Sequence, residues 1–166
     1  MVSKRFKPRI KARIRKNKQT VNNTINNFFE WIKGSKLVEL KECNTVDDPV
    51  RPELDNEFRV SNGRKIFGLK YNNEIEGVVC IAFTNELPAT VKELDLMSVN
   101  EKDSQIAIAY TLWSLKKGAG KKIMKELLKY MKEQNNIDSI MTLSPLTPMA
   151  THYHIRNGAK LIKINP

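Results

Sequence analysis

The hydrophobic period of the chain changes at a short glycine turn, and this change limits the folds open to it. Residues 105–113 form a largely apolar run, which is typical of a central strand. The turn Lys117–Lys122 follows, and after it apolar residues recur at Ile123, Leu127 and Tyr130, the spacing of an amphipathic helix. A strand that leads through a tight turn into a helix indicates an α/β chain.

The other patterns place further strands and helices on both sides of this unit. We expect a helix from Asn23 or Thr24 to Gly34, a turn of helix at 91–96 and a short helix at 148–157 that ends at Gly158. Further strands are expected at 37–43, 65–71, 74–83, 139–143 and 160–164, with the second and third joined at Asn72 and Asn73 as a hairpin. The sequence therefore predicts a mixed α/β fold, one domain with a central mixed β-sheet flanked by helices.

The positive charge of the chain is concentrated near its N-terminus. Of 29 Lys and Arg residues, which face 18 Asp and Glu, nine precede residue 19, and no acidic residue comes before Glu30. These nine are Lys4, Arg5, Lys7, Arg9, Lys11, Arg13, Arg15, Lys16 and Lys18. We predict a flexible basic arm over residues 1–20 and a folded domain over 21–166. Such an arm fits binding of a nucleic acid or another polyanion, or of the phosphates of a ligand, and it equally fits a terminus that is only solvated. The sequence leaves these three roles open.

Composition excludes several classes of protein. With 40% hydrophobic and 28% charged residues, the chain has the composition of an ordinary folded protein. No window approaches the roughly 18 apolar residues of a membrane span, so we expect no membrane partner. Cys43 and Cys80 are far apart without metal-site spacing, and we expect reduced core thiols. With no secretory apolar segment, we expect a cytoplasmic protein, a transit peptide being the less favoured alternative. The oligomeric state stays open.

The glycine turn is a candidate anion-binding site. Glycines allow close approach of the backbone to a ligand, and the N–H groups that begin a helix point toward it. The residues that would form this site are Lys116, Lys117, Gly118, Ala119, Gly120 and Lys121, with Lys122 adding charge. Their spacing differs from that of a P-loop, which argues against a nucleoside triphosphatase. An ordinary turn remains the alternative.

Ser144 and His154 are the candidate catalytic residues. Ser144 follows the strand predicted at 139–143, and ligands of α/β sheets bind at the carboxyl ends of strands. His154 suits a general acid or base. His152, two residues away, would point to the other side of a helix, so we expect no metal site. The alternative is that Ser144 begins a turn and His154 packs against the sheet.

These elements together resemble the GNAT acyltransferase superfamily. Within that fold, four segments look closer to the catalytic domain of malonyl-CoA decarboxylase. They are VVCIAFTNELPATVKEL (78–94), QIAIAYTLWS (105–114), IMTLSPLTP (140–148) and HYHIRNGAKLIKIN (152–165). The resemblance implies that the glycine turn binds the pyrophosphate of acyl-CoA and that the serine of LSP, Ser144, and the histidine of HxxNGA, His154, are catalytic.

The sequence also departs from the decarboxylase pattern. After LSP the decarboxylases have Ile-Pro-Gly-Phe, where this chain has LTPM at 146–149. Its GAGKK turn is shorter and looks more like that of ordinary acyltransferases. The large N-terminal helical domain of the decarboxylases has no counterpart in this sequence.

The resemblance implies an acyl-CoA enzyme that decarboxylates malonyl-CoA, or a similar acyl-CoA, to acetyl-CoA and CO2. The coenzyme A thioester would be the substrate, and no tightly bound cofactor is expected. A second interpretation is acyl transfer to an amine, with His154 or Tyr153 protonating the CoA thiolate and Glu86 or Asp95 as base. A third is a non-catalytic protein whose basic arm binds a polyanion.

Overall fold

The computed structural model describes residues 8–144 together with positions 147, 152, 154–156, 158, 160 and 162, and for 8–19 it describes the backbone only. The chain divides into two compact units, Met1–Ser35 and Lys36–Pro166. Residues 21–34, which we had grouped with the folded domain, fall on the N-terminal side of this division. The expected boundary after residue 20 stays a prediction.

The described residues of the first unit form helix α1, which spans Pro8–Gly34. It begins well before the expected start at Asn23 or Thr24. Proline is tolerated in the first turn of a helix, where its missing N–H costs nothing, and no other Pro or Gly interrupts the sequence before Gly34. No helix in the described part of the chain combines the length and hydropathy needed to cross a bilayer.

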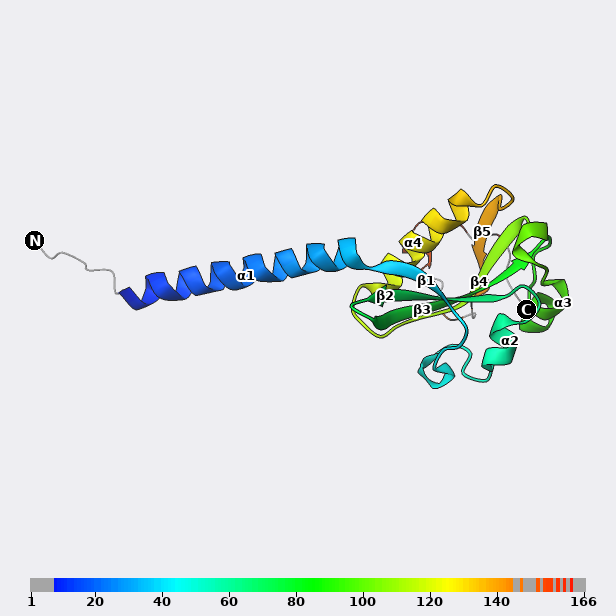
Figure 1. Cartoon of the computed structure of the whole chain (residues 1–166), viewed down its shortest axis with the longest axis horizontal. Helices are drawn as coiled ribbons and strands as arrows, with labels where there is room; N and C mark the ends of the chain where they lie inside the picture. The colour runs from blue at the N-terminus through cyan, green and yellow to red at the C-terminus, as the bar shows by residue number, and fades with distance from the viewer. Residues whose placement is uncertain are drawn as a thin grey trace, which may run out of the picture. The chain divides into compact units, whose positions relative to one another are not determined.

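Between residues 36 and 144, the second unit contains a mixed sheet, three α-helices and two short 3-10 helices (Figure 1). Its strands are β1 (Lys36–Leu40), β2 (Lys65–Tyr71), β3 (Glu74–Thr84), β4 (Ile106–Ser114) and β5 (Ser139–Thr142). Its helices are η1 (Thr45–Asp47), α2 (Asn56–Val60), α3 (Val91–Met97), η2 (Glu101–Asp103) and α4 (Ala119–Glu133). The predicted mixed α/β fold, with a mixed sheet and flanking helices, is confirmed.

The five strands lie in chain order, β1-β2-β3-β4-β5. The first three pairs are antiparallel, and β4 and β5 are parallel. The predicted hairpin is confirmed, because Asn72 and Asn73 join β2 to β3 with φ of 46° and 66°. Asparagine tolerates this left-handed conformation better than most residues. The parallel pair places the carboxyl ends of β4 and β5 at the same edge of the sheet.

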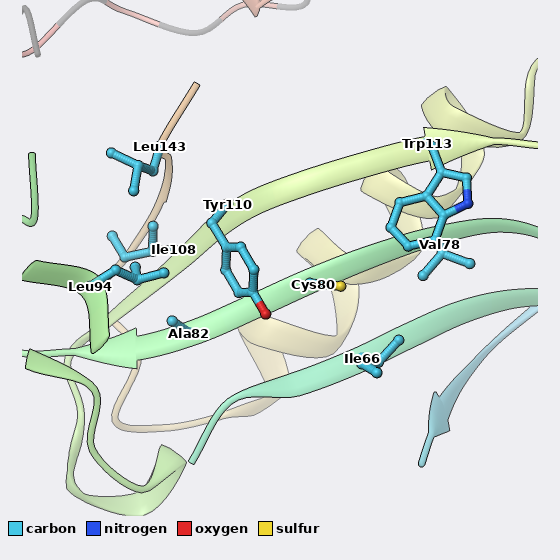
Figure 2. Close-up of a cluster of buried hydrophobic side chains, with 9 residues drawn as sticks. All are labelled: Ile66, Val78, Cys80, Ala82, Leu94, Ile108, Tyr110, Trp113 and Leu143. Atoms are coloured by element: carbon cyan, nitrogen blue, oxygen red, sulfur yellow. The ribbon is translucent and has the colours of Figure 1, made fainter. Parts of the chain in front are cut away.

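Helices cover both faces of the sheet (Figure 1). On one face lies α4, where Tyr130 packs on Phe67 of β2 with ring centroids 5.2 Å apart. On the other face, Phe58 of α2 meets Tyr110 of β4 edge to face at 6.1 Å. Leu94 of α3 joins the buried cluster on this second face (Figure 2). The alternation of side chains along the strands supplies both apolar layers.

Several expectations differ from the structure or lie beyond it. The expected strand 37–43 ends at Leu40. We did not expect α2, where Asp55 caps the helix by accepting a hydrogen bond from Phe58 N at 2.7 Å. The helix expected at 148–157 is described only at 152 and 154–156, which are helical. Most of the strand expected at 160–164 lies outside the described residues.

Both cysteines are free thiols, as expected, but only Cys80 is fully buried. Cys43 is half-buried, and its N–H donates to Asn56 Oδ1 at 2.9 Å. A hydrogen bond with the Cys80 thiol lowers the pKa of Cys43, against the opposing effect of burial. The same contact and burial raise the pKa of Cys80. The two thiols are therefore neighbours on the second face of the sheet.

Candidate active site

The glycine turn connects β4 to α4 through one residue with a left-handed backbone. Gly118 has φ 89° and ψ −14°, a left-handed conformation that costs an L-residue free energy, and it is the N-cap of α4. Its carbonyl accepts from Lys122 N at 3.1 Å, and Ala119 N donates to Lys116 O at 3.1 Å. Among the described residues, the N–H groups of Gly120 and Lys121 have no backbone acceptor outside the helix. Such N–H groups at a helix start suit an anion.

The lysines around the turn are not equivalent. Lys116 Nζ lies 2.5 Å from Glu76 Oε1, and Glu76 is almost fully buried. Lys122 pairs with Glu126 at 2.7 Å on the next turn of the helix. Lys117 and Lys121 are exposed. Of the predicted lysines, these two therefore have the clearest access to a phosphate, whereas Lys116 is held by a carboxylate.

Small residues allow α4 to begin close to the sheet. Ala119 is fully buried, and Gly120 is buried beside it. A methyl group added at Gly77 of β3 would lie 3.4 Å from both Ala119 Cβ and Trp113 O. These residues bring the helix start against the end of β4. The small size of Ala119 and Gly120 thus permits this close packing, and Gly118 remains exposed at the turn.

β4 continues beyond the point where its pairing with β5 ends. The ladder runs from Ile106↔Ser139 to Ala109↔Thr142, followed by a hydrogen bond of 3.0 Å from Leu143 N to Ala109 O. On its other side, β4 carries a bulge, because Thr111 lies opposite Cys80 and Ala109 opposite Ile81. Tyr110 therefore has no opposite residue in β3. Bulges of this kind are frequent beside active sites.

Ser144 lies just past the end of β5, as the sequence predicts. It is half-buried, and its hydroxyl donates to Thr142 Oγ1 at 3.3 Å. Both Ser144 and the glycine turn follow the carboxyl ends of the parallel strands β5 and β4, and so lie toward the same edge of the sheet. This is the edge at which α/β sheets bind ligands.

His154 lies in the short helical stretch 154–156 and is half-buried. Burial lowers the pKa of its imidazole from the usual value of 6.5, because the charged form is less well solvated there. Most of the residues between Ser144 and His154, including Tyr153, lie outside the described part of the chain. That the two side chains share a site therefore stays a prediction.

Arg51 links the two strands at the end of their ladder, and sequence reasoning missed it. Its Nε donates to Tyr110 O at 2.9 Å, and its Nη2 donates to Leu143 O at 2.9 Å. These are the carbonyls that follow the last paired residue of β4 and of β5. A guanidinium can bridge them because its N–H donors form a rigid planar fork.

The main chain of Arg51 is hydrogen-bonded to both members of a buried ion pair, Asp48 and Arg59. Asp48 Oδ2 is 2.9 Å from Arg59 Nη2, and both side chains are fully buried. Asp48 also accepts from Thr111 Oγ1 of β4 at 2.8 Å. Arg59 further donates to Cys80 Sγ at 3.2 Å. The acids and prolines at 47–52 are typical of a polar loop, and nothing in that pattern indicates that one of its carboxylates is buried.

The Tyr110 side chain places a polar hydroxyl inside the buried cluster on the second face of the sheet. Its hydroxyl is buried, makes no hydrogen bond that meets standard geometry among the described residues, and is directed over β3 toward Cys80 (Figure 2). Burial, together with Cys80, raises the pKa of Tyr110. The hydroxyl is therefore neutral over the physiological range and faces away from the strand edge that carries Ser144.

Glu86 and Asp95, the carboxylates considered as bases for acyl transfer, lie away from the glycine turn. Asp95 pairs with Arg64 at 2.8 Å, and the Arg64 side chain is almost fully buried. Glu86 is exposed and follows the end of β3, next to the start of the antiparallel β4. It therefore lies at the opposite end of β4 from Gly118. The structure brings neither carboxylate to the glycine turn.

Comparison with known proteins finds similarity at the level of structure only. No protein-family model and no curated protein sequence matches the chain. Malonyl-CoA decarboxylase from Rhodopseudomonas palustris matches with a TM-score of 0.53 and 18% identity, over 87% of this chain and 40% of that one. The decarboxylase from Cupriavidus metallidurans matches with a TM-score of 0.51 and 18% identity, over 75% of this chain and 34% of that one.

A ribosomal-protein-alanine N-acetyltransferase from Brucella melitensis biovar Abortus 2308 matches with a TM-score of 0.50 and 11% identity. The alignment covers 78% of this chain and 94% of the acetyltransferase. The chain thus spans less than half the length of the decarboxylases it matches but nearly all of the acetyltransferase. At these identities the similarity shows the fold.

Proposed function

We propose that this chain, which has a GNAT-like fold, is an acyl-CoA enzyme that decarboxylates malonyl-CoA or a similar acyl-CoA. One observation carries the proposal. The glycine turn and Ser144 follow the carboxyl ends of neighbouring parallel strands, whose pairing ends between them. A ligand at this edge of the sheet would have an anion-binding turn at one end and a hydroxyl at the other.

The proposed binding mode follows β4. The diphosphate of coenzyme A would accept from the Gly120 and Lys121 amides, with Lys117 and Lys121 supplying charge. The stretch Tyr110–Ser114 beyond the ladder is about 17 Å long at roughly 3.3 Å per residue. An extended pantetheine arm lying along this stretch would bring the thioester toward the bulge at Tyr110 and toward Ser144.

The chemistry requires stabilisation of an enolate. Breaking the bond between the malonyl carbon and its carboxylate releases CO2 and moves the electron pair onto the thioester oxygen. Backbone N–H groups around the bulge at Tyr110 would stabilise that oxygen. Ser144 would donate a hydrogen bond to the leaving carboxylate or to the thioester. His154 would then protonate the carbon, which gives acetyl-CoA.

N-acyl transfer is the second candidate, and one observation favours it. The match to the acetyltransferase covers 94% of that protein, whereas the matches to the decarboxylases cover 40% and 34% of theirs.

The position of the candidate bases weighs against acyl transfer, because transfer to an amine needs a base for the ammonium proton. Asp95 is engaged by Arg64, and Glu86 lies at the far end of β4. This supports decarboxylation as the first candidate.

The test is to incubate the protein separately with malonyl-CoA and acetyl-CoA and to follow both thioesters and free CoA by mass spectrometry. Conversion of malonyl-CoA to acetyl-CoA is expected in the wild type, with a loss of about 100-fold or more in Ser144→Ala and His154→Ala. Ser139→Ala, at the opposite end of β5, and His152→Ala, on an exposed position, are the matched controls. Intact malonyl-CoA in the presence of bound CoA would redirect the search to amine acceptors. Absence of any CoA binding would refute the acyl-CoA proposal.

A further inference from the structure

Arg51 occupies the place where β4 and β5 stop pairing. Carbonyl oxygens are acceptors only, so Tyr110 O and Leu143 O cannot bond to each other. Arg51 donates to both, at 2.9 Å each. Hydrogen bonds from a charged donor are stronger than those between neutral groups. The guanidinium therefore connects the two strands just beyond their last backbone hydrogen bond.

The backbone of Arg51 is held in place by the buried ion pair. Arg51 N donates to Asp48 Oδ1 at 3.1 Å, and Arg51 O accepts from Arg59 Nη2 at 2.8 Å. Asp48 is in turn bound by Thr111 of β4. The side chain and the main chain of Arg51 are thus both fixed with respect to β4. Such a fixed donor can define the position of what it binds.

The group that Arg51 binds is directly joined to Ser144. Leu143 O belongs to the planar peptide unit whose nitrogen is that of Ser144. The same residue, Leu143, donates its own N–H to Ala109 O at 3.0 Å. Leu143 is buried, whereas Ser144 is half-buried. Fixing the Leu143 carbonyl therefore orients the peptide plane from which the Ser144 side chain extends.

We propose that Arg51 is a positioning residue for Ser144, acting through the Leu143 carbonyl, and that its bidentate fork rather than its charge alone sets the serine hydroxyl relative to β4. The inference rests on the proposed function for its effect on catalysis. Its structural part, the hold on the Leu143–Ser144 peptide, is independent of the reaction. Misplacing a reacting group by about 1 Å can cost up to about 100-fold in rate.

The experiment compares Arg51→Lys, Arg51→Gln and Arg51→Ala with the wild type, and Lys129→Gln on the exposed face of α4 is the control for loss of a surface charge. Two readouts are needed. Hydrogen exchange of the Leu143 amide, which donates to Ala109 O, and the chemical shift of the Ser144 amide, both followed by NMR, report the conformation at the end of the ladder. Turnover of malonyl-CoA gives kcat and KM, and an effect on kcat alone is expected because the Arg51 side chain donates to Tyr110 O and Leu143 O, not to the glycine turn that would hold CoA.

We expect faster exchange at Leu143 and a shifted Ser144 amide signal in all three Arg51 variants, and a lower kcat with little change in KM. Lysine should not substitute, because one ammonium cannot reproduce the planar fork. Millimolar guanidinium chloride should partly restore kcat to Arg51→Ala but not to Ser144→Ala. A variant that merely unfolds more easily would not be rescued by a mild denaturant, and its melting temperature distinguishes that case.

Two results would overturn the inference. One is unchanged exchange at Leu143 together with an unshifted Ser144 amide signal in Arg51→Gln, which removes the structural claim even when the wild type turns over no CoA ester. The other is a fully active Arg51→Lys, which assigns the effect to charge and not to the fork. Absence of turnover in the wild type, with accelerated exchange in the variants, refutes the proposed function and leaves Arg51's hold on the peptide established.

Discussion

The carboxylate of Asp48 and the guanidinium of Arg59 lie 2.9 Å apart with neither side chain exposed to solvent. Asp48 comes from the loop after β1, Arg59 from α2, and Thr111 of β4 completes the bonding of the carboxylate. One buried anion thus joins a loop, a helix and a central strand. The loop that carries Arg51 depends on it.

Removing one partner of this pair should leave the other as an uncompensated buried charge. We expect Asp48→Asn and Arg59→Met each to lower the free energy of unfolding by about 3–5 kcal/mol. Glu39→Gln is the control, since Glu39 pairs with Lys65 at 3.0 Å with 56% of its side chain exposed. It should cost about 1 kcal/mol or less. Urea denaturation measures all three, and equal effects would contradict the assigned role of burial.

Gly118 should resist substitution because of its left-handed backbone. We expect Gly118→Ala to cost about 1–2 kcal/mol of stability and to weaken CoA binding. Gly118→Asn should cost less, because asparagine tolerates this conformation. Thermal unfolding and calorimetric titration with CoA measure the two effects. If alanine and asparagine were equally tolerated, the turn would not require the conformation that the structure assigns to it.

His154 should link stability and activity to pH in opposite directions. Burial lowers its pKa in the folded state, so the neutral form is favoured there. Its contribution to stability is therefore fully present above the unfolded-state pKa, near 6.5, and is lost as the pH falls through the folded pKa. As the proton donor it must be charged, so kcat should fall as the pH rises through a value below 6.5.

His154→Gln separates these effects. The variant should lose the acid-induced drop in melting temperature that His154 causes in the wild type, while turnover is low at every pH. NMR titration of the imidazole gives the pKa directly. A value at or above 6.5 would contradict the described burial.

Deleting residues 1–20 tests the basic arm. We expect the truncated chain to lose its salt-dependent affinity for a labelled DNA duplex or heparin, because the deletion removes all nine basic residues that precede Glu30. Conversion of malonyl-CoA should largely survive. Fluorescence anisotropy over a series of salt concentrations measures the first effect. Loss of turnover together with retained DNA binding would reverse the roles assigned to arm and domain.

Elements with local sequence signals were predictable before the fold was known. The hairpin at Asn72–Asn73, the strand that becomes β4 and the glycine turn into α4 each carry their own turn chemistry and period, and the structure has all three. Ser144 was predicted at the carboxyl end of a strand for the same reason. Periodicity and turn propensity act over a few residues, so they can be read from the chain.

Which distant residues meet at this edge of the sheet could not be predicted, because that depends on how the elements pack. Asp48 and Thr111 are far apart in sequence, as are Arg51 and Leu143, yet both pairs are joined by hydrogen bonds. An arginine and an aspartate in a proline-containing loop look like solvated surface residues, since no local pattern marks a charge as buried. Their burial results from the packing of the loop and α2 against β4. That packing brings a charged donor to the carbonyl beside Ser144.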